Sequence, residues 1–335
     1  MDSIPPTPHL QSVSTEESSR AKQRESGGRI SYRVAVPYSN SRVTRPKLAG
    51  GDLQGRIIED RYRLTFPLGR GGMSTVYLAR DMTCGRHYAI KVLHRDLVER
   101  SRYRRRFFNE IESVRRVNHP AVVRMFELGE LDDGRLFIVM EYVRGVSLKQ
   151  VIAKGPVPME RTVSIVSAVA AGLRAAHSRG VIHRDLKPAN VLIPRRGEGG
   201  RVAKIVDFGL ARIVGSPSLT RSSEIMGTPL YLSPEQATGA AADHRCDVYS
   251  LGVLMYEMTT GERLFSGRDA ATLIRQHASK RPIPVRKRRP DLSIPPILED
   301  LIMKCLEKRP DKRPYDMNRV LAILRLFDGS EGYRN

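Results

Sequence analysis

The sequence has 335 residues, 40% of them hydrophobic, which is enough apolar material for a folded core and excludes a disordered chain. Lysine and arginine number 57 against 36 aspartates and glutamates, and the net charge of +21 favours polyanionic partners, although a solvated arginine-rich surface explains it equally well. Cys84, Cys246 and Cys305 form no C-x-x-C pair, and neither a signal peptide nor an apolar run of about 18 residues is visible, so we expect a cytoplasmic protein without a membrane span.

Residues 1–55 are rich in Pro, Ser, Gly and Arg and poor in large apolar residues, which predicts a basic, mostly disordered tail. Within this tail, residues 30–38 place Ile30, Tyr32, Val34, Val36 and Tyr38 at every second position. This alternation is typical of a half-buried strand and makes a docking strand one interpretation. The composition of the surrounding residues favours the alternative, a solvated tail.

Two textures follow the tail. Residues 56–143 consist of short apolar runs between turn residues, with an Asp-Asp-Gly turn at 132–134, and this pattern predicts an antiparallel sheet. Residues 144–327 are mainly helical in pattern, and "DVYSLGVLMYEM" is apolar on nearly all sides, as in a central buried helix. Residues 328–335 form a short C-terminal tail. The order of strands and helices predicts an α+β fold.

The stretch "LGRGGMSTVYLAR" is a glycine-rich loop that can bind phosphate in either of two structural contexts. A dinucleotide fold requires a helix directly after the glycines. Here Ser74, Thr75, Val76 and Tyr77 follow, and β-branched and aromatic residues favour a strand. The loop is therefore predicted to join two strands, with glycine allowing backbone amides to approach phosphate oxygens. An ordinary glycine hairpin explains the loop equally well by itself.

The apolar run "HYAIKVL" contains a single cation, Lys91, whose burial is costly without an anionic partner. The stretch "RRRFFNEIESVRRV" has helical spacing and places Glu110 on the same face as Ile111 and Val114. We therefore expect Glu110 to pair with Lys91. A border residue that reaches solvent is the alternative for this glutamate.

The segment "VIHRDLKPANVLI" encloses several polar side chains between two apolar runs, a density that a core does not tolerate without a function for them. Asp185 can accept a proton from a hydroxyl, Lys187 can neutralise a phosphoryl group, and Asn190 can coordinate a hard cation. Asp207 follows the apolar strand of "AKIVDFGLAR" and precedes a glycine, which suits a second Mg²⁺ ligand.

These motifs, in this order, resemble those of the protein kinase family over residues 60–327. The matches include Gly69-x-Gly71-x-x-Ser74-x-Val76, Ala89-Ile90-Lys91, His183-Arg184-Asp185, Asp207-Phe208-Gly209 and Ser233-Pro234-Glu235. Ser74 and Ser233 replace a glycine and an alanine of the family pattern. "GGMSTVYLARD" and "YLSPEQA" are most similar to the bacterial eukaryotic-type (Hanks-type) Ser/Thr protein kinases.

The resemblance implies a two-lobed fold, with an N-lobe at 56–143 built on an antiparallel sheet with one main helix, and a mostly helical C-lobe at 144–327. It implies transfer of the γ-phosphoryl of ATP to Ser/Thr hydroxyls of protein substrates, with Mg²⁺ held by Asn190 and Asp207. The implied catalytic residues are Asp185, Lys187, Lys91 and Glu110. The implied ATP-binding residues are Leu68, Gly69, Gly71, Ser74, Val76, Ala89, Lys91, Met140, Glu141, Val143, Asn190, Leu192 and Asp207.

The resemblance also assigns roles to five further residues. Asp247 would brace the catalytic loop, which is residues 183–190, and Arg313 would pair with Glu235. By their distance from Gly227-Thr228, Thr220 and Ser222 match the positions phosphorylated in the bacterial relatives. Activation by autophosphorylation there, through a transient homodimer, is expected.

Two alternatives come from other functional classes. A pseudokinase scaffold would lack one of Lys91, Asp185 and Asp207, and all three are present. A nucleic-acid-associated regulator would explain the basic runs "RSRYRRR" and "VRKRRP". No recognised binding module or aromatic stacking platform accompanies these runs, so solvated basic faces on a kinase are the preferred interpretation and nucleic acid is not an expected partner.

Overall fold

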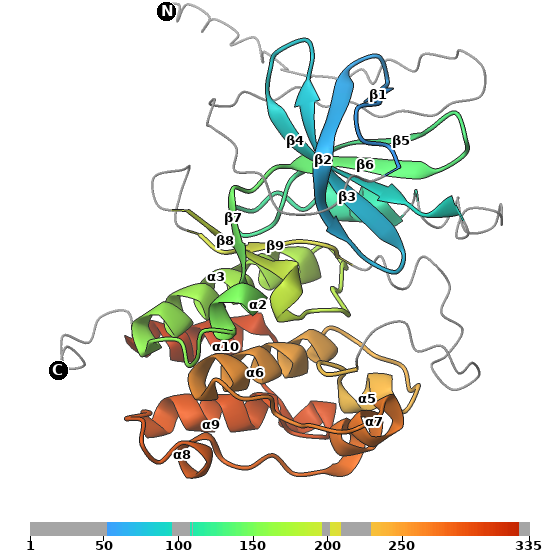
Figure 1. Cartoon of the computed structure of the whole chain (residues 1–335). Coiled ribbons are helices and arrows are strands. Elements are labelled where there is room, and N and C mark those ends of the chain that lie inside the picture. Colours follow the sequence, from blue (N-terminus) through green and yellow to red (C-terminus); the bar gives the residue numbers. More distant parts are fainter. Residues whose placement is uncertain (1–51, 96–107, 109, 196–201, 209–228, 328–335) are drawn as a thin grey trace, which may run out of the picture.

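The computed structural model describes residues 52–95, 108, 110–195, 202–208 and 229–327. The strand-like segment 30–38, Thr220 and Ser222 lie outside the described residues. The chain folds into a sheet-built lobe and a helical lobe, with the sheet at one end of the molecule and α8 and α9 at the other (Figure 1). No helix in the described ranges combines the length and the apolar composition that crossing a membrane requires.

The sheet-built lobe contains one six-stranded antiparallel sheet, in the order β1-β2-β3-β4-β6-β5. A turn with Gly134 at φ +84° joins its last two strands, as the Asp-Asp-Gly sequence predicts. Residues 110–115 are helical. The strands are β1 Ile57–Ile58, β2 Tyr62–Arg70, β3 Ser74–Asp81, β4 His87–Leu93, β5 Met125–Glu130 and β6 Leu136–Glu141.

One face of this sheet has a core of its own, separate from the main core of the molecule. Tyr88 packs edge-to-face against Tyr62 and Phe126, with ring centroids 5.6 and 5.4 Å apart. Leu53, only 1% exposed, belongs to the same cluster. The other face packs toward Ile111 and Val114 within the main core, so the alternating strand residues are buried on both sides.

The helical lobe contains a small sheet, β7-β8-β9, beside a set of helices. A parallel bridge between Val122 and Ile205 connects β9 to the chain that enters β5. The small strands are β7 Gly145–Ser147, β8 Val191–Pro194 and β9 Lys204–Ile205. The helices are α2 Leu148–Ile152, α3 Met159–His177, η2 Pro188–Asn190, α5 Pro234–Ala237, α6 Arg245–Thr260, α7 Ala270–Ser279, α8 Val285–Arg288, α9 Pro296–Cys305, η3 Pro310–Lys312, α10 Met317–Leu324 and η4 Arg325–Phe327.

Helix α6 is the centre of this lobe, and every residue from Cys246 to Thr260 is buried. The sequence predicts this because the helix has no continuous polar face. A Cβ atom built on Gly252 would lie 2.7 Å from Cys305 Cβ, so glycine permits the close packing of α6 on α9. The helix ends at Gly261, whose φ of +72° is the left-handed conformation that favours glycine at this position.

Candidate active site

The glycine-rich loop is the turn between β2 and β3, so the prediction that a strand follows the glycines is confirmed. Gly69 pairs with Val76 across the hairpin, and the Gly71 N–H donates to the Ser74 carbonyl at 2.9 Å. A Cβ atom on Gly69 would meet nothing within 4 Å, and one on Gly71 would meet only that carbonyl, at 3.8 Å. Packing within the chain therefore does not require these glycines, which suits a loop whose backbone is approached by a ligand.

Several of the predicted ATP-binding residues lie on neighbouring strands. Ala89 on β4 lies opposite Met140 on β6, and Lys91 lies opposite Val76 on β3. The Glu141 N–H donates to the Arg124 carbonyl at 2.8 Å, so this amide is already used inside the protein. Leu68, Val143 and Leu192 are partly buried beside them.

The catalytic loop is held by the carboxylate of Asp247 on α6. Its Oδ2 accepts the His183 N–H and its Oδ1 accepts the Arg184 N–H, each at 2.8 Å. Arg184 has a φ of +61°, a left-handed conformation that costs energy in a residue other than glycine and persists only where its surroundings enforce it. Burial pushes the pKa of Asp247 upward, but hydrogen bonds and charge, chiefly from His177, outweigh burial and hold it below its usual range.

Asp185 lies at the centre of a small polar cluster directly after this strained residue. The Lys187 amine donates to Asp185 Oδ2 at 2.6 Å. The buried Asn190 amide donates to the Asp185 carbonyl at 2.8 Å and to Oδ2 at 3.2 Å. The Asp185 and Lys187 side chains are 38% and 39% exposed, so a substrate hydroxyl can reach them. The structure therefore brings together three of the residues singled out in the sequence.

The strand lysine meets Asp207, the predicted metal ligand, across the two lobes. Lys91 Nζ lies 2.8 Å from Asp207 Oδ1, and the Lys91 side chain is 8% exposed. Burial acts to raise the pKa of Asp207, but the adjacent Lys91 charge and hydrogen bond lower it below its usual value. Asp207 has a φ of +62°, so it too is held in a strained conformation next to His183, whose ring donates to the Val206 carbonyl at 3.0 Å.

The sequence prediction that Lys91 pairs with Glu110 is not met in this structure. Among the described residues Lys91 pairs with Asp207 instead, and Glu110 Oε1 lies 4.0 Å from Arg184 Nη1. The physical reason is that the buried ammonium needs one anionic partner, and the carboxylate of Asp207 fills that role here. The partly exposed Glu110, at 30%, satisfies its charge on the catalytic-loop arginine.

The donor set at this site fits Mg²⁺. Asp207 supplies carboxylate oxygens and Asn190 an amide oxygen, and Mg²⁺ prefers such oxygen ligands with the remainder from water and phosphate. No group of three His, Cys, Asp or Glu side chains within the described ranges forms a complete metal cage.

Two supporting side chains were not found from the sequence. His177 Nε2 lies 2.8 Å from Asp247 Oδ2, and Gln236 Nε2 donates to the Arg184 carbonyl at 2.8 Å. Gln236 is oriented by a capping box with Ser233, because the Ser233 hydroxyl accepts the Gln236 N–H and the Gln236 side chain accepts the Ser233 N–H. This explains the serine that replaces alanine in the family motif.

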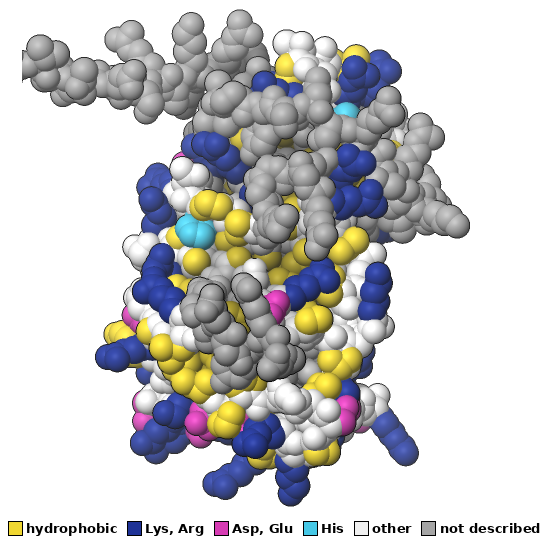
Figure 2. Space-filling model, turned by 90° about the vertical axis from the view of Figure 1, so that its left-hand side faces the viewer, with side chains coloured by type: hydrophobic (Ala, Val, Ile, Leu, Met, Phe, Trp, Pro, Cys, Tyr) yellow, Lys and Arg dark blue, Asp and Glu magenta, His cyan; other side chains and the backbone are white. Residues whose placement is uncertain are grey.

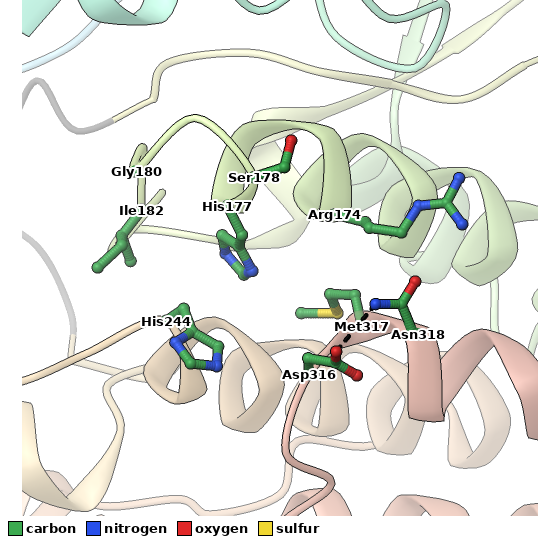
Figure 3. A pocket seen from close by; sticks show the side chains of 9 residues that line it. All are labelled: Arg174, His177, Ser178, Gly180, Ile182, His244, Asp316, Met317 and Asn318. Carbon is green, nitrogen blue, oxygen red and sulfur yellow. Dashed lines mark hydrogen bonds between the residues drawn. The ribbon is translucent and has the colours of Figure 1, made fainter.

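His177 forms part of the wall of a pocket of about 330 Å³ between the end of α3 and the start of α10 (Figure 3). The view shows His177 at the end of α3, facing His244 across a gap, with Asp316 and Met317 on the α10 side. The two imidazole rings are 5.6 Å apart, and His244 contacts the Tyr315 carbonyl through Nε2 at 2.8 Å. Lys91, Asp185, Asn190 and Asp207 do not line this pocket.

The predicted pair of Arg313 and Glu235 is confirmed. Arg313 donates to Glu235 Oε1 and Oε2 at 2.8 and 2.7 Å, and its side chain is fully buried. Two parallel N–H bonds to one carboxylate fix both the distance and the orientation of the groups. The pair therefore anchors α5, which carries Gln236, to the segment that follows η3.

Comparisons with known proteins agree with this geometry. The sequence profile described as "Protein kinase domain" matches residues 62–322. The chain is 41% identical over 280 residues to Serine/threonine-protein kinase pkn3 of Myxococcus xanthus, covering 82% of this chain and 51% of that protein. It is 40% identical over 279 residues to Serine/threonine-protein kinase PknB of Mycolicibacterium smegmatis, covering 81% of this chain and 44% of that protein.

Solved structures lead to the same class. The crystal structure of the Mycobacterium tuberculosis PknI kinase domain matches with a TM-score of 0.63 and 27% identity, over 82% of this chain and 98% of that one. The chain belongs to the protein kinase family. Its relatives are bacterial Ser/Thr protein kinases, and the predicted α+β kinase fold is confirmed. The chain spans about half, or less, of the length of the curated relatives that it matches.

Proposed function

We propose that this chain transfers the γ-phosphoryl group of Mg-ATP to serine and threonine hydroxyls of proteins. The contact between Lys91 and Asp207, at 2.8 Å, carries the proposal, because it joins a cation of the sheet-built lobe to the metal-binding turn of the helical lobe. Asp207 follows β9, and its neighbour Val206 donates its N–H to the Asn190 carbonyl at 2.9 Å. One triphosphate can therefore reach the side chains of Lys91, Asn190 and Asp207.

Each residue has a role that follows from its charge and position. Lys91 holds the α and β phosphates, and the backbone of Gly69 and Gly71 covers the phosphate chain. Asn190 and Asp207 hold Mg²⁺, which neutralises charge on the phosphates when it is bound. Asp185 orients the acceptor hydroxyl and takes its proton, while Lys187 stabilises the transferred phosphoryl group.

The remaining side chains bind the nucleotide base or support the lysine. We assign the adenine surface to Leu68, Val76, Ala89, Met140, Val143 and Leu192, which are apolar, with Glu141 and Ser74 at its edges. With Mg-ATP bound, Asp207 would hold the metal and Lys91 the phosphates. Glu110 would then exchange Arg184 for Lys91 as its partner and orient the ammonium toward those phosphates.

Activation fits the same exchange. A phosphate on Thr220 or Ser222 carries about −2 charge and competes with Glu110 for Arg184, which Glu110 approaches at 4.0 Å. Release of Glu110 then allows it to pair with Lys91. We infer that a second copy of the chain phosphorylates this segment in a transient dimer. The free thiols of Cys84, Cys246 and Cys305 suit a reducing, ATP-containing compartment, and we place the kinase domain in the cytoplasm.

The experiment is incubation of the purified protein with labelled ATP and Mg²⁺, beside Asp185→Asn. The variant should incorporate phosphate at least a few hundredfold more slowly, since positioning and charge stabilisation supply most of the rate. Mass mapping should locate phosphate at Thr220 or Ser222. Equal labelling of both proteins would mean that Asp185 has another role. ATP binding by the natural protein without any phosphate transfer would favour the pseudokinase scaffold.

A further inference from the structure

The basic run "VRKRRP" contains four consecutive cations, and the structure divides them into two kinds. Arg288 pairs with Glu262, its Nε donating at 2.6 Å. Arg289 pairs with Asp291 through two bonds of 2.8 and 2.7 Å. These two side chains are therefore paired with acids of the same chain, and such exposed pairs contribute little to stability.

Arg286 and Lys287 differ from their neighbours. Neither side chain has an acidic group within 4.0 Å anywhere in the part of the chain that the structure describes, and both are exposed. Glu299 Oε1 accepts the backbone N–H of Arg286 at 2.7 Å, so this acid contacts the backbone of Arg286. The two cations are available to a partner.

The same two residues line a hollow of about 600 Å³ between α8 and the start of α9. The paired cations Arg288 and Arg289 do not line it. Its walls are largely apolar and include three prolines, which are stiff and carry no N–H of their own. The lining residues are Arg286, Lys287, Pro290, Leu292, Ser293, Ile294, Pro295 and Pro296.

We propose that this hollow, which we call the α8–α9 site, docks an acidic protein segment that also carries apolar side chains. Arg286 and Lys287 meet its carboxylates, and Leu292 with the prolines meets its apolar residues. The net charge of +21 steers acidic partners toward the molecule. The segment belongs to a protein substrate, an assignment that rests on the proposed kinase function.

Nucleic acid fits this site less well. None of the residues that line the hollow is aromatic, so unpaired bases have no stacking surface. Polynucleotide affinity also depends on many phosphate contacts along a continuous basic surface. In Figure 2, lysine and arginine side chains are scattered over the upper and lower parts of the face shown and form no single stripe.

The α8–α9 site lies at the end of the molecule away from the sheet-built lobe (Figure 1). A segment docked there leaves the phosphoryl-transfer residues untouched and raises the local concentration of an acceptor on the same substrate. Its removal should therefore increase KM for the docked substrate and leave kcat unchanged.

Binding is tested first in the Asp185→Asn background, so that the result does not depend on catalysis. The probe is a short fluorescent peptide that alternates glutamate with leucine, followed by anisotropy. Arg286→Glu combined with Lys287→Glu should weaken binding about tenfold, the ratio that a loss of about 1.4 kcal/mol produces. The control, Lys149→Glu with Lys154→Glu, changes net charge equally at two exposed residues on and after α2 and should change binding less than about twofold.

Three outcomes overturn the proposal. Absence of peptide binding is the first, and equal weakening by both double variants, which would indicate overall charge alone, is the second. The third is a single-stranded oligonucleotide that displaces the peptide and loses its own affinity in the Arg286 and Lys287 variant. In the protein that keeps Asp185, Arg286→Glu combined with Lys287→Glu should raise KM for an acceptor peptide that is linked to the acidic segment. KM for the unlinked acceptor peptide should not change.

Discussion

Replacement of the buried Arg313 gives the sharpest test of the forces that hold the site. Arg313→Met keeps the length of the side chain and removes its charge and its donors. It leaves the Glu235 carboxylate, which lies 8% exposed, without its counter-charge. It also removes the donors to the carbonyls of Glu307, Arg245 and Lys308, which are 2.8, 2.9 and 3.0 Å away.

The structure sets the size of the effect. Breaking a buried ion pair on one side costs about 3–5 kcal/mol, because the remaining charge stays buried. For a folded domain of this size that corresponds to a fall in Tm of roughly 5–8 °C. Arg309→Met is the matched control, since Arg309 pairs with Asp311 on the surface and its side chain is 74% exposed. The control should cost less than about 1 kcal/mol.

The pH dependence separates a charge effect from simple loss of packing. Burial acts to raise the pKa of Glu235, but the hydrogen bonds and charge of Arg313 hold it below its usual value. In the natural protein this stabilisation is present above the unfolded-state pKa and is lost as the pH falls through the folded-state pKa. Without Arg313 the largest lowering influences are lost and burial dominates, so the pKa of Glu235 rises and the penalty shrinks as the pH falls from 7 to 5.

The assay is urea unfolding of both variants and the natural protein at pH 7 and pH 5, with the free energy of unfolding taken from the linear extrapolation. We expect the cost of Arg313→Met to be smaller at pH 5. A cost below about 1 kcal/mol at pH 7, or a cost independent of pH, would refute the reasoning.

Two further predictions concern other buried groups. Asp247→Asn replaces a carboxylate oxygen, which accepts the N–H of His183 or Arg184, with an amide nitrogen that cannot accept. In steady-state assays kcat should therefore fall by at least about tenfold. The control is Asp243→Asn, at an acid whose side chain is 45% exposed, which should leave kcat unchanged. Burial lowers the pKa of His277 to about 4, so between about pH 6.5 and 4 the unfolded chain binds one proton more than the folded chain. The free energy of unfolding should therefore fall as the pH falls from about 6.5 to 4. Equilibrium unfolding at several pH values checks this, and His277→Leu should reduce the slope by the contribution of one proton.

The sequence predicts those parts of the site that depend on local pattern. The strand after Gly71, the polar loop around Asp185 and the buried α6 all follow from periodicity and residue type. The partner of Lys91 does not follow, because Asp207 lies far from Lys91 in the sequence and the contact depends on how the two lobes are placed. The contact of His177 with Asp247 joins residues 70 positions apart and leaves no periodic signal.

Gln236 is a similar case, since its role depends on the strained backbone of Arg184 that it contacts. A capping pattern at Ser233 is visible in the sequence and predicts a helix start. It does not indicate that the capping side chain also reaches the catalytic loop. Tertiary contacts of this kind require coordinates.

The contact between Lys91 and Asp207 has a consequence for the order of events at the cleft. With its ammonium already neutralised from within, the cleft presents little net attraction to a stray inorganic anion. On the proposed function, a nucleotide bound together with Mg²⁺ would exchange one set of opposite charges for another, because Asp207 would hold the metal and Lys91 the phosphates. The internal counter-ion would thus favour the metal-loaded nucleotide over the free one.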